Sequence, residues 1–294
     1  MSPRTVQFKQ VDVFTSVPFK GNPLAVIFDA DGLSTERMQQ IARWTNLSET
    51  AFILPPTDAR ADYRVRIFTK TTELPFAGHP TLGSAHAVRD AGYQPKTPGK
   101  MVQECGVGLV ALEERADGAW AFAAPPASIV QLDESQRKRL ADALAPAVID
   151  FTAPPCAVNN GAPWLIVRMQ DAAQCLALVP QREMLAALVD EVDTHGVVVY
   201  GPHADATPAT FELRALMFHG EDPEDPVTGS ANAALATLLT AQNLRPGPAY
   251  TVRQGTALDR DGRISITYDD TNANGPTVWI GGSAVTVIDG TFSL

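Results

Sequence analysis

The pattern of apolar and polar residues predicts alternating strands and helices from the start of the chain. Runs rich in β-branched and aromatic residues, which favour strands, occupy residues 7–14, 24–28, 51–54 and 63–68. Met38, Ile41 and Ala42 recur at helical spacing after Ser34, a residue type that caps helices. Glu49 follows this pattern and precedes the third run, so it stands at a predicted helix-to-strand junction.

Two further helices are predicted from segments rich in small side chains. One begins near Thr81 and the other covers the segment around Ala231 and Leu238. Small side chains allow close approach, so we expect both helices to be buried inside surrounding sheets. Alternating runs predict further strands at residues 101–104, 109–113, 264–268, 277–280 and 284–288. The predicted fold class is α+β, with mostly antiparallel sheets.

The chain also contains an internal duplication. The residues Pro80, Gly83, Ser84 and Ala85 recur as Pro226, Gly229, Ser230 and Ala231, each 146 positions later. Further upstream, residues 21–27 resemble residues 161–167 at a spacing of 140. Repeats that build solenoids or propellers are about 20 to 50 residues long, so this spacing indicates a duplicated domain.

The 146-residue register predicts which side chains correspond in the two halves. His79 corresponds to Asp225, and Glu49 corresponds to His195. In a fold with pseudo-twofold symmetry, two proton carriers would then face one cleft.

Composition and charge exclude several classes of function. The 294 residues are 45% hydrophobic and 19% charged, which suffices for two packed cores. The net charge of -10 and pI near 4.9 give no basic surface for nucleic acid and oppose binding to an anionic membrane. Neither a signal peptide nor a membrane-spanning stretch is predicted, so we expect a cytoplasmic protein.

The starts of the two small-residue helices are the expected location of the chemistry. The first turn of a helix leaves backbone N–H groups unpaired and carries partial positive charge, so it binds carboxylates or phosphates. Gly78, Gly83, Gly229 and Ser230 would allow a substrate close to this backbone. No P-loop or dinucleotide-binding glycine motif is present, so nucleotide binding is not predicted.

Three ionisable residues are candidates for acid–base chemistry, and each also has a simpler interpretation. Glu49 is otherwise a solvated carboxylate, His79 a turn histidine, and Asp225 part of an exposed acidic loop. His195 is a weaker candidate for the opposite wall of the cleft. The histidines outside these motifs are expected to be structural or on the surface, namely His86, His203 and His219.

Metal and thiol chemistry are not predicted. No pair of histidines or cysteines has metal-ligand spacing, and no Gly-x-Ser-x-Gly motif indicates a serine hydrolase. The three cysteines are odd in number and widely spaced, which favours structural thiols: Cys105, Cys156 and Cys175.

Five motifs together resemble the phenazine biosynthesis PhzF family, in the same order and with similar spacing over essentially the whole chain. They are Asp12-Val13-Phe14, Gly21-Asn22-Pro23, Asn46-Leu47-Ser48-Glu49-Thr50, Pro75-Phe76-Ala77-Gly78-His79-Pro80-Thr81 and Asp225-Pro226-Val227-Thr228-Gly229-Ser230-Ala231. The resemblance implies a diaminopimelate-epimerase-like fold with two pseudo-symmetric halves and an active site that opens between them. The halves expected from it are residues 1–116, completed by a C-terminal strand at 280–294, and residues 117–279.

The resemblance also implies a cofactor-independent isomerase that acts on a small carboxylate substrate. The phenazine enzyme isomerises trans-2,3-dihydro-3-hydroxyanthranilate by moving a proton between ring carbons. Glu49 matches the family's catalytic carboxylate, and His79 and Asp225 match its supporting acid–base residues. Gly78, Gly229 and Ser230 match the region that holds the substrate. Homodimers are common among such relatives.

The hypothesis for the mechanism is a one-sided proton transfer. Glu49 removes a proton from carbon and returns it elsewhere on the same face, while a protonated His79 or Asp225 stabilises the developing charge. An epimerase or racemase is one alternative, and it would need His79, Asp225 or His195 as a second base. A non-catalytic binding protein on the same fold is the other alternative.

Overall fold

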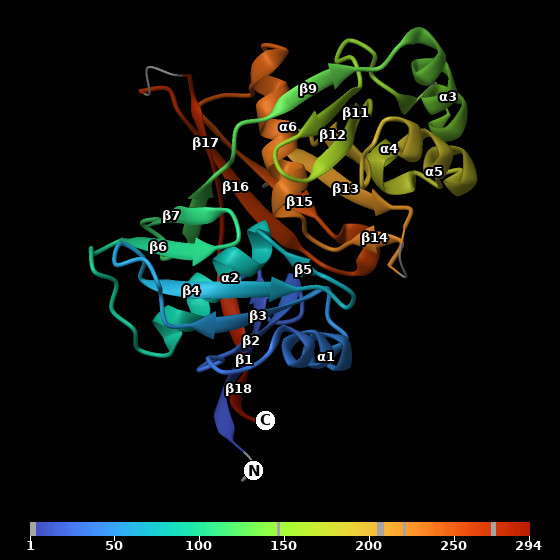
Figure 1. Cartoon of the computed structure of the whole chain (residues 1–294). Helices are drawn as coiled ribbons and strands as arrows, with labels where there is room; N and C mark the ends of the chain where they lie inside the picture. Colours follow the sequence, from blue (N-terminus) through green and yellow to red (C-terminus); the bar gives the residue numbers. More distant parts are fainter. Residues whose placement is uncertain (1–3, 146–147, 205–208, 220–221, 272–274) are drawn as a thin grey trace. The chain divides into compact units, whose positions relative to one another are not determined.

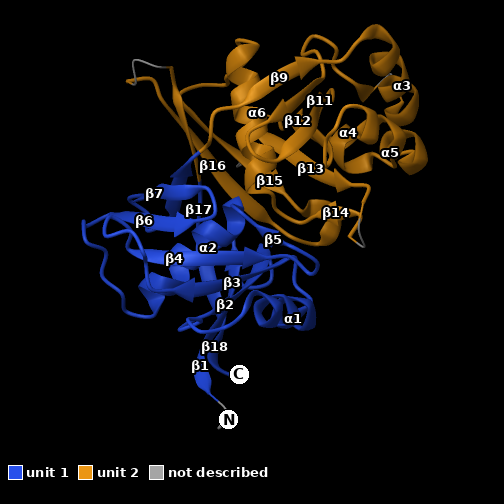
Figure 2. Cartoon of the chain, viewed as in Figure 1, with its two compact units in different colours: residues 1–123, 281–294 blue, residues 124–280 orange. Residues whose placement is uncertain are grey.

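Two units of tertiary structure divide the chain, with unit 1 formed by residues 1–123 and 281–294 and unit 2 by residues 124–280 (Figure 2). The structure is a computed structural model that describes residues 4–145, 148–204, 209–219, 222–271 and 275–294. The boundary at residue 116 expected from the sequence precedes β8, the strand of unit 1 at Trp120–Ala123.

Unit 1 contains strands from both ends of the chain and two helices (Figure 1). Its elements are β1 (Thr5–Val13), β2 (Asn22–Ile27), α1 (Thr35–Thr45), β3 (Glu49–Leu54), β4 (Tyr63–Phe68), β5 (Glu73–Leu74), α2 (Gly78–Asp90), β6 (Lys100–Cys105), β7 (Gly108–Glu114), β8 and β18 (Ala284–Ser293). The C-terminal strand β18 pairs with β1 along nine residues of β1, from Thr5 to Val13.

Unit 2 repeats this order of elements and adds helices. Its elements are β9 (Ser128–Gln131), α3 (Glu134–Leu144), β10 (Cys156–Asn159), β11 (Pro163–Arg168), α4 (Ala172–Ala177), α5 (Arg182–Glu191), β12 (Gly196–Pro202), β13 (Phe211–Met217), β14 (Glu224–Asp225), α6 (Gly229–Ala241), β15 (Ala249–Gln254), η2 (Thr256–Leu258), β16 (Gly262–Asp269) and β17 (Thr277–Gly282), whose last two residues belong to unit 1.

The strand pairings of the two units correspond one to one. Parallel pairs join β2 to β3 and β4 to β6 in unit 1, and β11 to β12 and β13 to β15 in unit 2. The other pairs described within each unit are antiparallel, as in β1–β18 and its counterpart β10–β9. The predicted α+β class with mostly antiparallel sheets is therefore confirmed, and the topology itself carries the internal duplication.

The central helices α2 and α6 are buried on nearly all sides. Ten of the 13 residues of α2 and nine of the 13 residues of α6 are buried. Within unit 1, α2 contacts β1, β2, β3, β6, β8 and β18, whereas in unit 2 α6 contacts β10, β11 and β16. A helix without a polar face has no side that favours water, so it is buried on all sides, here by strands. The predicted burial of both helices is confirmed, although α2 begins at Gly78 rather than near Thr81.

Close packing of α2 gives a prediction for Gly83. A Cβ atom built on Gly83 would lie 2.6 Å from Leu24 Cδ2 and 2.8 Å from Val13 Cγ2. We expect Gly83→Ala to destabilise the protein by about 1 to 3 kcal/mol, because strand side chains must shift to accommodate the methyl group. Urea unfolding measures this, with Gly290→Ala as the control because its Cβ would meet no atom within 4 Å. Equal stability of the two variants would contradict the packing described.

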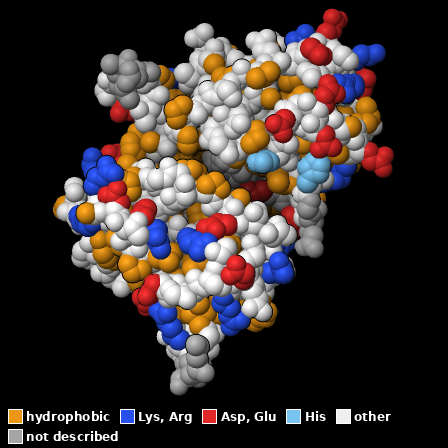
Figure 3. All heavy atoms as spheres, viewed as in Figure 1, with side chains coloured by type: hydrophobic (Ala, Val, Ile, Leu, Met, Phe, Trp, Pro, Cys, Tyr) orange, Lys and Arg blue, Asp and Glu red, His pale blue; other side chains and the backbone are white. Residues whose placement is uncertain are grey.

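On the face shown in Figure 3, acidic and basic side chains are interspersed and form no basic patch. This agrees with the acidic composition of the chain. No described helix is both long and apolar enough to cross a membrane.

Candidate active site

The first residue of β3, Glu49, is held by a short, well-defined connection from α1. Ser34 Oγ accepts a hydrogen bond from the backbone N–H of Arg37 and caps the start of α1. The helix ends at Asn46, whose left-handed backbone (φ 57°) turns the chain toward β3. Thr45 and the fully buried Thr50 share a hydrogen bond of 2.8 Å between their hydroxyl groups across this turn. The backbone that carries Glu49 is therefore fixed on both sides.

Glu49 is largely buried and is not the solvated carboxylate that the simpler interpretation of the sequence expected. Its side chain is 17% exposed, and Oε2 lies 3.5 Å from Nε2 of His79, the second residue of α2. Parallel pairing places Glu49 opposite Leu24 of β2. The start of β3, the start of β2 and the start of α2 thus meet within unit 1.

His79 is 6% exposed, and its imidazole makes a hydrogen bond to the backbone of Pro23. Proline offers only a carbonyl oxygen, so the imidazole donates this bond. Nε2 has no hydrogen-bond partner among the described residues, which assigns the donated proton to Nδ1. The neutral imidazole therefore presents an unprotonated Nε2 toward Glu49.

The turn that supplies the Pro23 carbonyl is braced by Asp12. The Asp12 carboxylate is buried, and Oδ2 accepts a hydrogen bond of 3.0 Å from the backbone N–H of Gly21. Gly21 packs so closely that a Cβ atom there would lie 2.1 Å from the carbonyl oxygen of Val13. Two of the sequence motifs, at Asp12 and at Gly21, thereby serve the orientation of His79.

Burial dominates the electrostatics of His79. It lowers the pKa of the imidazole from 6.5 to about 3, and the bond to Pro23 offsets this only in part. A charged Glu49, with Oε2 3.5 Å from Nε2, would act in the opposite direction and raise the pKa of His79. The lowered pKa favours a neutral His79 near pH 7, so it does not support the expectation of a protonated His79 that stabilises charge.

The start of α2 offers backbone N–H groups beside this pair. Its N-cap residue Ala77 has an extended backbone and no side chain that caps the helix, and the first turn contains no acidic residue. The backbone N–H groups of Gly78 and His79 precede the first N–H with an intrahelical partner, that of Thr81. A helix start of this kind carries positive partial charge and backbone N–H donors that suit a carboxylate.

In unit 2, Asp225 is the last residue of β14 and lies three residues before the N-cap Thr228 of α6. The Thr228 hydroxyl lies 2.5 Å from Asp225 Oδ2. Gly229 and the half-buried Ser230 begin α6, and Trp164 Nε1 donates a hydrogen bond of 3.0 Å to Ser230 Oγ. The structure thus brings Asp225, Gly229 and Ser230 to one helix start in unit 2, as it brings Glu49, Gly78 and His79 together in unit 1.

The strand pairings correct the duplication register at the helices. Leu74 pairs with Ile67 in β5 and β4, and Asp225 occupies the same place in β14 opposite Ala215 of β13. Asp225 therefore corresponds to Leu74, not to His79. The two helices begin at Gly78 and Gly229, 151 positions apart, so His79 corresponds to Ser230.

The register of Glu49 changes by one residue. Glu49 begins β3 and pairs with Leu24, whereas Gly196 begins β12 and pairs with Trp164. Gly196, and not His195, is therefore the counterpart of Glu49. His195 precedes β12, is exposed and stacks edge-on against Trp164, with the ring centroids 6.4 Å apart.

Buried glutamines are the functional candidates that the sequence analysis missed. Gln103 and Gln254 are fully buried, and each bonds a central helix, at Thr81 and at Asn232 respectively. Their spacing of 151 residues equals that of Pro75 and Pro226. That repeated spacing is the signal that could have identified them.

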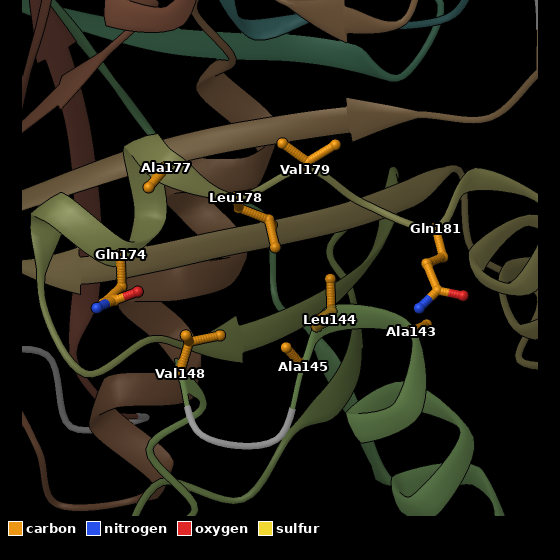
Figure 4. Close-up of a pocket in the computed structure, with 9 residues that line it drawn as sticks. All are labelled: Ala143, Leu144, Ala145, Val148, Gln174, Ala177, Leu178, Val179 and Gln181. Atoms are coloured by element: carbon orange, nitrogen blue, oxygen red, sulfur yellow. The ribbon is translucent and has the colours of Figure 1, made fainter.

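Other chemistries receive no support from the described residues. Burial raises the pKa of all three cysteine thiols, so thiolates are not favoured at neutral pH. No described group of three or more His, Cys, Asp or Glu side chains could hold a metal ion. A cavity of about 180 Å³ in unit 2 (Figure 4) is lined by small and apolar side chains and two glutamines and has no titratable group.

The whole sequence is similar to one protein family and to several known proteins. A family model described as phenazine biosynthesis-like protein matches residues 11–290. Antisense-enhancing sequence 1 of Schizosaccharomyces pombe is 39% identical over 96% of this chain and 97% of its own length. Trans-2,3-dihydro-3-hydroxyanthranilate isomerase of Pseudomonas aeruginosa is 32% identical over 95% of this chain and 96% of its own.

The fold has a close match among solved structures. The crystal structure of the Bacillus anthracis phenazine biosynthesis protein of the PhzF family superimposes with a TM-score of 0.86 at 23% identity, and the match covers 99% of this chain and 100% of that one. At this identity the match concerns the fold alone.

Proposed function

Because this chain belongs to the phenazine biosynthesis-like protein family, we propose that it is an isomerase that moves a proton within a small carboxylate substrate, with Glu49 as the acid–base group. The observation that carries the proposal is the pairing of Glu49 with a neutral His79 beside the uncapped start of α2. The name of the isomerase relative from Pseudomonas aeruginosa supports the reaction class.

Glu49 performs the proton transfer. Its largely buried carboxylate removes a proton from a substrate carbon and, as a carboxylic acid, returns it to another carbon on the same face. A positioned acid–base group accelerates such a step by about 10² to 10⁴-fold. The carboxyl group carries the proton throughout, so the proposal requires no cofactor.

His79 assists as a hydrogen-bond acceptor. Because Nδ1–H is directed to the Pro23 carbonyl, the lone pair of Nε2 is free to face Glu49 Oε2, which lies 3.5 Å from Nε2. That lone pair accepts a hydrogen bond from the carboxyl group of Glu49 when Glu49 is protonated. It has no hydrogen to donate to the ionised carboxylate. His79 thereby stabilises the form of Glu49 that exists between removal and return of the proton.

The helix starts supply the binding of the substrate carboxylate. The backbone N–H of Gly78, at the start of α2 where no side chain caps the helix, supports this role in unit 1, and the family resemblance extends the role to Gly229 and Ser230 of unit 2. Asp225 remains a proposed supporting group, and it acts as a hydrogen-bond acceptor because the hydroxyl of Thr228 lies 2.5 Å from its Oδ2.

The experiment that tests the substrate uses trans-2,3-dihydro-3-hydroxyanthranilate with the purified full chain. We expect the wild-type chain to remove the ultraviolet diene signal. Glu114→Gln is the control and should remove it equally fast, because Glu114 is an exposed carboxylate of β7. If the signal persists, a panel of small carboxylic acids is incubated in D₂O and analysed for carbon-bound deuterium. Saturable binding without isomerisation or exchange for any acid of the panel would contradict the isomerase and favour a binding protein.

A further inference from the structure

We propose that Gln254 is a positioning residue that fixes Asp225 and the start of α6 for the isomerase reaction. Gln254 ends β15 and is fully buried. Its side chain makes four hydrogen bonds, all to the segment from Asp225 to Asn232. The proposal rests on the proposed function, because it assigns Gln254 a task in that reaction.

Backbone groups force the orientation of the Gln254 amide. Oε1 lies 3.0 Å from the backbone nitrogen of Thr228, which can only donate, and Nε2 lies 3.1 Å from the carbonyl oxygen of Asp225, which can only accept. Exchanging the oxygen and nitrogen of the amide would break both bonds. The amide therefore has one orientation, and it joins both ends of the turn that leads into α6.

That orientation sets the direction of the next hydrogen bond. Nε2 also donates to Thr228 Oγ1 at 2.8 Å, so the hydroxyl oxygen accepts there and directs its own proton to Asp225 Oδ2 at 2.5 Å. Oδ2 therefore works as an acceptor, and the carboxyl group needs no proton at this oxygen. Gln254 thus holds the backbone of Asp225 directly and its carboxylate through Thr228.

A related but smaller contact occurs in unit 1, where the Oε1 of Gln103 accepts a hydrogen bond of 3.0 Å from the Tyr63 hydroxyl and only its Nε2 reaches the helix. Gln103 Nε2 donates to Thr81 Oγ1 at 2.9 Å, and Gln254 Oε1 accepts from Asn232 Nδ2 at 3.2 Å. Thr81 and Asn232 are each the fourth residue of their helix. In unit 1, Ala77 stands where unit 2 has the N-cap Thr228, so no hydroxyl group can extend this contact. The extension to an acidic residue is specific to unit 2.

Two variants of Gln254 separate positioning from folding. Gln254→Glu keeps the shape but removes the amide donor, and Gln254→Leu removes all four hydrogen bonds without adding charge. We expect kcat per folded protein to fall about 10²-fold in both, with KM changed less than about threefold, because small displacements of catalytic groups reduce rates to this degree. Lower pH should partly restore Gln254→Glu, since the introduced carboxyl group donates again when protonated.

Gln131→Glu and Gln131→Leu are the matched controls, because Gln131 is an exposed strand residue of the same unit. Wild-type kcat in both Gln254 variants would overturn the proposal, as would a loss of rate that follows only the fraction of unfolded protein.

Hydrogen exchange at the Thr228 amide tests the role of Gln254 separately from the isomerase activity. We expect the amide proton of Thr228 to exchange at least about 10-fold faster in Gln254→Leu than in wild type, because its acceptor is lost. If the wild-type chain isomerises none of the acids tested, the proposed function fails and the proposal falls with it. If the chain is active and exchange at Thr228 is unchanged, the proposal alone is overturned.

Discussion

Glu49→Gln should reduce kcat by about 10³-fold while the affinity for substrate stays within a few fold of wild type. Glutamine has nearly the shape of glutamate but cannot accept a proton from carbon, and acid–base groups contribute about 10² to 10⁴-fold to the rate. The side chain of residue 49 remains packed near His79, so binding through the helix starts is preserved. Steady-state kinetics and isothermal titration of the same preparation measure the two quantities.

Glu114→Gln is the control for the loss of a carboxylate at a remote exposed position of unit 1. Near wild-type kcat in Glu49→Gln would remove Glu49 from the mechanism. A loss of affinity with kcat unchanged would instead indicate a role in uniform binding, because an interaction made only in the transition state lowers kcat without raising KM.

Most strands of unit 1 were predicted because they are rich in β-branched and aromatic residues, and burial alternates along part of β4, whereas the short strands β5 and β8 were missed. The run predicted at residues 63–68 coincides with β4 (Tyr63–Phe68), and the cap predicted at Ser34 accepts the hydrogen bond expected of it. Both signals are local, since strand alternation and helix capping act within a few residues. The predicted junction at Glu49 followed from these two signals together.

The helix α3 was not predicted, although its sequence contains a local signal. Asp133 and Gln136 form a capping box in which each side chain bonds the backbone of the other residue. The following residues are mostly polar and charged, so apolar periodicity alone gives a weak indication of a helix there. Searching for caps as well as for periodicity would have identified it.

The register error has a physical origin in the composition of buried helices. Both central helices need small residues at many positions, so Gly83-Ser84 in the middle of α2 resembles Gly229-Ser230 at the start of α6. Pairing of strands settles the register because hydrogen bonds fix which residues are opposite. The sequence alone therefore identified the duplication and the candidate residues, but it could not match them correctly across the halves.

The state of His79 also could not be predicted from the sequence. A histidine between Gly78 and Pro80 reads as a turn residue with an ordinary pKa, whereas the neutral form follows from burial by residues distant in the chain. The residues that pack around a side chain are a tertiary property. The proposed mechanism changes accordingly from charge stabilisation by an imidazolium to acceptance of a hydrogen bond by an imidazole.

The buried neutral His79 should make the protein lose stability in acid. Its folded-state pKa of about 3 lies below the ordinary value of 6.5, so the unfolded chain binds more protons between these pH values. The contribution is fully present above pH 6.5 and is lost as the pH falls toward 3. The loss amounts to about 1.4 kcal/mol for each pH unit in this window and reaches at most about 5 kcal/mol.

His79→Asn isolates this contribution, because asparagine does not titrate and its amide can still donate to the Pro23 carbonyl. Urea unfolding from pH 7 to pH 4.5 should show the stability difference between wild type and His79→Asn shift in favour of the variant as the pH falls. His219→Asn, at an exposed histidine paired with Asp190, should not reproduce that slope. Since burial is the dominant cause, the slope should persist in a Glu49→Gln background. A pH-independent difference, or an imidazole of His79 that titrates near pH 6.5 by nuclear magnetic resonance, would contradict the lowered pKa of the buried ring.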